Sequence, residues 1–147
     1  MPDEVGIARR APYALALLRI VSGLIFLEHG TKKFLGFPGG EGAGAGWLFD
    51  NPGAFAGIIE LLAGALITIG LFTRPAAFLA SGTMAVAYWI AHAPQDFFPI
   101  NNGGDAAILY CFVFLYLVFA GPGAWSVDTV RLRRNKATMA NSTETAH

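Results

Sequence analysis

Four long apolar stretches, separated by short segments rich in helix-breaking residues, dominate the chain. They cover about residues 11–34, 54–72, 76–93 and 102–120. A helix needs about 20 residues to cross roughly 30 Å of hydrocarbon. The first two stretches reach this length, the third is marginal, and the fourth needs Asn102–Asp105 as its first turn. The pattern predicts an all-α membrane protein, a four-transmembrane-helix bundle.

The composition agrees with a lipid environment. Of the 147 residues, 54% are hydrophobic and 14% are charged, and the mean hydropathy is +0.51. A soluble domain of this size buries too little of its surface to hide so many apolar side chains. The formal net charge of zero gives no basic excess for nucleic acid. Cys111 is the only cysteine, which excludes an intrachain disulfide or a Cys-x-x-Cys redox pair.

The basic residues outside the apolar stretches predict an orientation. Seven fall on one side of the bilayer: Arg9, Arg10, Arg74, Arg131, Arg133, Arg134 and Lys136. The other side has only Lys32 and Lys33. Because short cytoplasmic segments carry the excess of Lys and Arg, both termini are expected in the cytoplasm of a plasma-membrane protein.

This orientation divides the chain into three parts: a cytoplasmic N-terminal segment (1–10), the transmembrane domain (11–123) and a basic, polar cytoplasmic tail (124–147). The tail after Lys136 is so polar that we expect no regular structure there. Arg19 interrupts the first apolar stretch and no Ala-x-Ala site follows it, so this stretch is expected to be a retained helix rather than a signal peptide.

Ionisable side chains inside the predicted spans point to a polar site. Each costs about 2.5–3.5 kcal/mol on insertion scales and needs a partner. Apart from Arg19, they belong to the outer half of the predicted membrane domain: Glu28, His29, Lys32, Lys33, Glu60, His92 and Asp105.

Helical spacing brings some of these groups together. Arg19, Gly23, Phe26, Gly30 and Lys33 share one face of the first helix, and Gly53, Gly57, Glu60 and Gly64 share one face of the second. Glycines let membrane helices approach closely, so Glu60 should lie near His29, Lys33 and Arg19. Two interpretations stay open: a structural ion pair, or a carboxylate that handles protons beside a histidine.

Aromatic residues gather at the same outer end: Trp47, Phe49, Tyr88, Trp89, Phe97, Phe98 and Tyr110. They fit an interfacial belt of aromatic side chains. They also fit the wall of a pocket for a lipid-soluble ring such as a quinone, with Glu60, His29 and His92 as hydrogen-bond partners. His29 and His92 could instead be axial ligands of a haem, but two histidines without flanking support do not favour one. No metal-binding pattern is present.

The ordered set of short motifs resembles the DoxX family over about residues 13–128. The motifs are Leu18-Arg19-Ile20 with Gly23, His29-Gly30-Thr31-Lys32-Lys33, Glu60 with Gly64, Gly70-Leu71-Phe72-Thr73-Arg74, His92-Ala93-Pro94, Asn101-Asn102-Gly103-Gly104-Asp105, Gly121-Pro122-Gly123, Trp125-Ser126 and Asp128. Asp105 stands where the family pattern has a glutamate, and Glu28 is an additional carboxylate.

The resemblance implies a four-helix bacterial inner-membrane protein. Relatives are linked to quinone-dependent sulfur oxidation, as in the membrane subunit of thiosulfate:quinone oxidoreductase. Others are linked to thiol and oxidative-stress complexes with soluble enzymes. Many relatives have no assigned activity, so the resemblance supports the fold better than the reaction.

Three functions remain open, and the sequence does not decide whether the chain is an enzyme. The first is a quinone-associated subunit of a redox complex. Here Glu60 and His29 handle protons, and the binding residues are Arg19, Lys33, Tyr88, His92, Asn101, Asn102 and Asp105. The second is a non-catalytic anchor or assembly factor that docks protein partners or anionic lipid through Arg131–Lys136. The third is a small transporter, which would need a homo-oligomer.

Overall fold

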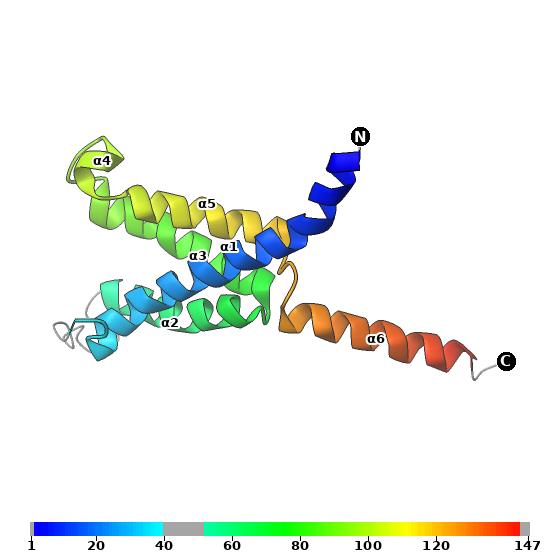
Figure 1. The fold of residues 1–147 in the computed structure, drawn as a ribbon. Coiled ribbons are helices and arrows are strands. Elements are labelled where there is room, and N and C mark those ends of the chain that lie inside the picture. Colours follow the sequence, from blue (N-terminus) through cyan, green and yellow to red (C-terminus); the bar gives the residue numbers. More distant parts are fainter. Residues whose placement is uncertain (1, 40–51, 145–147) are drawn as a thin grey trace.

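The described part of the chain, residues 2–39 and 52–144 of the computed structural model, is helical and contains no strand. Its helices are α1 (Pro2–Leu35), α2 (Pro52–Ile69), α3 (Thr73–Ala87), the π-helical turn η1 (Tyr88–His92), α4 (Pro99–Asn102), α5 (Asp105–Ala120) and α6 (Val127–Glu144). Figure 1 shows α4 at one end of the bundle and both ends of the chain at the other. We call these the α4 end and the terminal end.

Helices α1 and α2 pack closely because glycines remove the side chains between them. A Cβ atom added to Gly64 would lie 2.8 Å from the Cα atom of Leu27, and one added to Gly30 would lie 2.8 Å from the main-chain nitrogen of Leu61. Both distances are too short for a real side chain. The glycine faces predicted from the sequence are therefore the faces along which the two helices meet.

The second helix pair is α3 with α5, and alanines on α3 form its contact face. Ala76, Ala77 and Ala80 are buried against a core that includes Phe26, Ile67, Phe114 and Leu117. The rings of Phe26 and Phe114 pack edge to face with centroids 4.8 Å apart, which joins α1 to α5. Many large apolar side chains remain exposed on the outside of the bundle, among them Leu17, Val21, Leu62 and Phe112.

By length and composition, two described helices could cross a membrane: Val5–Leu35 of α1 and all of α2. Helix α5 is apolar but has 16 residues. Helix α3 has 15 residues and runs directly into the five of η1. The described helices thus include all four predicted apolar stretches, while the number of spans and their orientation stay predictions.

Glycines in left-handed conformations explain where the observed helix ends differ from the expected ones. Gly70, with φ +71°, follows α2, so the second stretch ends at Ile69 rather than at 72. Gly103, with φ +66°, separates α4 from α5. Asn102 consequently belongs to α4, and the expectation that the fourth helix begins there is wrong.

The two chain ends are more regular than expected. Residues 2–10 form the first turns of α1, and their predicted cytoplasmic position stays a prediction. The tail expected to lack regular structure after Lys136 continues α6 to Glu144. Alanine and methionine there favour a helix. Figure 1 shows α6 extending beyond the bundle at the terminal end.

Candidate functional site

At the terminal end, Arg19 is fully buried, and its partners among the described residues are all main-chain oxygens. Its guanidinium donates to five carbonyl oxygens at 2.7–3.4 Å: those of Ile67, Thr68, Pro122, Ala124 and Trp125. Two of these belong to the last turn of α2, where carbonyls have no partner within the helix. Arg19 therefore fastens α1 to the end of α2 and to the segment after α5. The structure does not bring it to Glu60.

Asp128 makes a second connection at this end. Its two carboxylate oxygens accept hydrogen bonds from the main-chain N–H groups of Phe72 and Thr73, each at 2.9 Å. Burial alone would raise the pKa of Asp128, but these bonds and the nearby Arg131 outweigh it and hold the pKa below 3.8, its ordinary value. Asp128 thereby caps the start of α3 from α6. Its place in the family pattern was the only sequence signal for this role.

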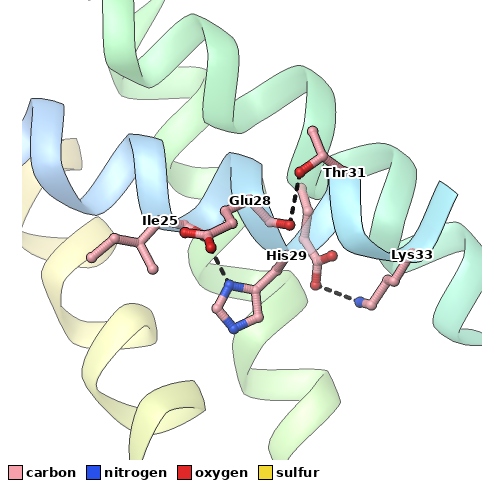
Figure 2. A network of polar contacts seen from close by, with 6 residues as sticks. Ile25, Glu28, His29, Thr31 and Lys33 are labelled. Carbon is pink, nitrogen blue, oxygen red and sulfur yellow. Dashed lines mark hydrogen bonds and ion pairs between the residues drawn. The ribbon is translucent and has the colours of Figure 1, made fainter. Parts of the chain in front are cut away.

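At the α4 end, Glu60 of α2 meets Lys33 of α1, as the helical spacing predicts. Lys33 Nζ lies 2.6 Å from Glu60 Oε1, and the Glu60 side chain is 3% exposed against 33% for Lys33. The dashed line at Lys33 in Figure 2 marks this ion pair. Within the described residues, the other carboxylate oxygen, Oε2, is buried without a hydrogen-bond partner. A buried polar atom without a partner is costly, so Oε2 is available to a ligand.

His29 lies on the same stretch of α1 but does not bond to Glu60. Its Nδ1 lies 2.8 Å from the carbonyl oxygen of Ile25 one turn earlier, a contact drawn in Figure 2. A carbonyl can only accept, so Nδ1 carries the proton and, in the neutral ring, Nε2 has a free lone pair. The ring packs edge to face against Tyr110 of α5, with centroids 5.9 Å apart.

His92 is positioned by two of the other predicted residues. Its Nδ1 lies 3.0 Å from the carbonyl oxygen of Asn102, and Tyr88 stacks on its ring with an angle of 20° between the planes. Asn102 is itself buried, with its side-chain amide donating to the carbonyl of Asp96 and its oxygen accepting from Gly104. Tyr88 and Asn102 therefore hold His92 in place.

A cavity of about 770 Å³ lies between the α1–α2 pair and the α3–α5 pair. Most of its wall is apolar, and its polar lining includes Glu60, Lys33, His29, His92 and Tyr110. Ligand sites in proteins have this size and this balance of apolar wall with a few polar groups. Four of the predicted site residues therefore share one cavity.

The remaining predicted residues do not line the cavity. These are Arg19, Tyr88, Asn101, Asn102 and Asp105. Asn101 and Asp105 are exposed. Among the predicted aromatics, Tyr110 lines the cavity, whereas Trp89, Phe97 and Phe98 are exposed outside it. Trp47 and Phe49 lie outside the described residues. Sequence reasoning missed Phe55 and Phe78, because on their own helices nothing distinguishes them from lipid-facing side chains.

The described part of the chain contains no group of three or more His, Cys, Asp or Glu side chains that could hold a metal ion. The histidines of the cavity are each tied through Nδ1 to a main-chain carbonyl. The site therefore presents hydrogen-bonding groups, a buried ion pair and aromatic rings.

Apolar helices with exposed hydrophobic surfaces, and a largely apolar cavity with one buried ion pair, define an all-helical membrane protein. The sequence profile of the DoxX family matches residues 14–93. The chain therefore belongs to the DoxX family.

Two of three similar proteins are named as membrane proteins. A Haemophilus influenzae protein named only as uncharacterized is 48% identical over 120 residues, which cover 80% of this chain and 90% of that protein. Inner membrane protein YphA of Escherichia coli is 34% identical over 138 residues, covering 85% of this chain and 94% of YphA. An uncharacterized membrane protein of Mycobacterium tuberculosis is 29% identical over 132 residues, covering 80% of each chain. No solved structure matches the chain.

Proposed function

We propose that this chain is a quinone-associated subunit of a redox complex in the inner membrane. It crosses the bilayer four times with both termini in the cytoplasm, and it binds a quinone in the cavity between the helix pairs. The observation that carries the proposal is the buried Oε2 atom of Glu60, which has no partner among the described residues and belongs to the wall of a largely apolar cavity.

The side chains of the cavity can supply what a quinone needs from its protein. A quinone takes up two electrons and two protons to become a quinol, with the electrons coming from a sulfur or thiol substrate through a partner enzyme. Glu60 can hold a proton at Oε2, and Lys33 on Oε1 stabilises the carboxylate once that proton has left. His29, whose Nδ1 is committed to Ile25, can accept or return a proton at Nε2.

Gentle purification of the wild-type protein and two variants tests the proposal. We expect close to one quinone or quinol per wild-type chain. Glu60→Gln should lower the bound quinol about tenfold or more, because a quinol hydroxyl can donate to the carboxylate and a hydrogen bond to a charged group contributes about 1.5–3 kcal/mol. Glu28→Gln is the matched control, since Glu28 is an exposed carboxylate of α1 that does not line the cavity. It should leave the quinone content unchanged. A folded wild-type protein without quinone would refute the proposal.

A second candidate function, an anchor for partner proteins, is favoured by α6. Arg131, Arg133, Arg134 and Lys136 are all exposed on this helix, which extends beyond the bundle (Figure 1). Cutting the chain after Val130 removes these charges and keeps Asp128 in its contact with α3. An anchor would lose its co-purifying partners on this truncation, whereas a quinone subunit that binds its partner through the bundle would retain them. Nothing in the described residues favours the oligomeric transporter.

A further inference from the structure

The cavity is closed on one side by aromatic contacts between α1 and α5. The ring of Tyr110 on α5 lies 5.9 Å from that of Phe26 and 5.9 Å from that of His29, both on α1. Phe26 is 1% exposed and Ala107 of α5 is 6% exposed. Phe26 and Ala107 therefore close the inner part of the cavity between α1 and α5, where a ligand cannot pass without separating these helices.

The opposite side, between α2 and α3, is open. These helices are joined by a short turn at Gly70–Phe72, from which Figure 1 shows them diverging toward the α4 end. The cavity residues on this side are apolar and exposed: Phe55 on α2, and Phe78, Leu79 and Val86 on α3. In a membrane, side chains of this kind face hydrocarbon. The cavity is therefore continuous with the lipid between α2 and α3.

Gly82 occupies this opening. It is the only glycine of α3 and η1, it lines the cavity, and a Cβ atom added to it would meet nothing within 4 Å. The glycines of the α1–α2 contact are different, since a Cβ atom at Gly57 or Gly64 would lie 2.8 Å from the neighbouring helix. Close helix packing therefore does not explain Gly82. Its effect is to leave room between α2 and α3.

We propose that the gap between α2 and α3 is a lateral portal through which a tailed, lipid-soluble ligand enters from the bilayer. This inference rests on the proposed quinone function. The ring reaches Glu60 and Lys33, while the hydrocarbon tail passes Gly82 and stays in the lipid. Water is a poor place for a long apolar tail, and the lipid beside this gap can hold it instead. The portal thus selects quinones by their tails as well as their rings.

Two probes and one matched control test the portal. The full chain is reconstituted in lipid nanodiscs, and binding of a quinone with a decyl tail is compared with that of tetramethylbenzoquinone, which has no tail. Gly82→Phe should weaken binding of the tailed quinone about tenfold and that of the tail-less one by less than about twofold. Gly6→Phe is the control, because a Cβ atom at Gly6 also meets nothing and Gly6 does not line the cavity. It should change neither affinity. Equal losses for both probes, or no loss for either, would overturn the portal.

A measurement without quinone separates the portal from the proposed function. A nitroxide attached to Gly82→Cys, in a chain carrying Cys111→Ala, should be accessible to oxygen dissolved in lipid and shielded from a water-soluble relaxation agent. If the wild-type protein binds neither quinone, the proposed function fails. A nitroxide at position 82 that is relaxed by oxygen in lipid but not by the water-soluble agent still supports the portal. Relaxation of the nitroxide by the water-soluble agent would show that the cavity opens to solvent instead, and would overturn the portal.

Discussion

Two buried ions in this protein, Arg19 and Glu60, have different surroundings. Every hydrogen bond of Arg19 goes to a main-chain carbonyl, and five such acceptors share its guanidinium. Glu60 has one charged partner, Lys33, on Oε1. Its other carboxylate oxygen, Oε2, has no hydrogen-bond partner among the described residues. A satisfied ion is part of the framework, whereas an incompletely satisfied one can bind a ligand at little cost. We therefore place Glu60 in the site and Arg19 in the framework.

Replacing Arg19 should unfold the terminal end of the bundle. Each buried carbonyl left without a donor costs about 1–3 kcal/mol, so Arg19→Gln should lower the free energy of unfolding by at least about 3 kcal/mol. Arg19→Lys should lower it less, because an ammonium group has three donors. Reversible unfolding in mixed detergent micelles measures this, with the exposed Arg9→Gln as control. A stability of Arg19→Gln within about 0.5 kcal/mol of wild type would show that these bonds contribute little.

The Lys33–Glu60 pair could be predicted from the sequence, and the surroundings of Arg19 could not. Lys33 and Glu60 each lie on a face marked by glycines, so helical spacing alone brings them together. The partners of Arg19 are carbonyl oxygens, which every residue has, and those near Pro122 follow from how the chain turns after α5. The free Nε2 of His29 could also not be predicted from the sequence, because it depends on a local hydrogen bond between Nδ1 and the carbonyl of Ile25.

At the scale of elements, α6 is fixed to the bundle mainly through its first turn. Asp128 caps α3 with both carboxylate oxygens, and the main-chain N–H of Asp128 donates to the carbonyl of Gly70 at 2.9 Å. The rest of α6 beyond Val130 is exposed wherever its side chains are described. The position of α6 relative to the bundle therefore depends on one short contact with the turn between α2 and α3.

Asp128→Asn should loosen that contact. The amide loses the charge that favours the helix N-terminus, and we expect a loss of about 1 kcal/mol in stability. The same contact gives a pH dependence, because the folded-state pKa of Asp128 is lowered from 3.8. Its contribution is fully present above about pH 3.8 and is lost as the pH falls through the lower folded-state value. Unfolding at pH 7 and below pH 3.8 measures this, and a variant that matches wild type at pH 7 would contradict it.

The helices could be predicted from apolar stretches, while their ends depended on single glycines. The left-handed Gly70 and Gly103 shorten α2 and create α4, and a hydropathy pattern does not show which glycine in a run adopts that conformation. Helix α6 was missed for another reason. Its polarity resembles that of an unstructured tail, although alanines and methionine in it favour a helix.

The whole molecule has a polar site near one end and most of its basic residues near the other. The ion pair of Glu60 and the cavity histidines lie toward the α4 end, whereas α6 with its exposed arginines extends from the terminal end (Figure 1). Proton exchange and partner binding would then occur on opposite sides of the bilayer. If the partner that supplies the electrons binds at the terminal end, the quinone has to leave the cavity, through the proposed lateral portal, to reach it.

Topology reporters test this separation directly. The basic residues at the terminal end predict that it is cytoplasmic, and Figure 1 places both chain ends there. Green fluorescent protein fused after Glu144 should therefore fluoresce, and alkaline phosphatase fused at the same place should be inactive. Phosphatase inserted between α4 and α5, at Gly103, should be active because the charge pattern predicts that the α4 end faces outward. The opposite pattern would place the arginines of α6 outside the cell. Partners would then have to reach the protein from that side, and the ion pair would exchange protons with the cytoplasm.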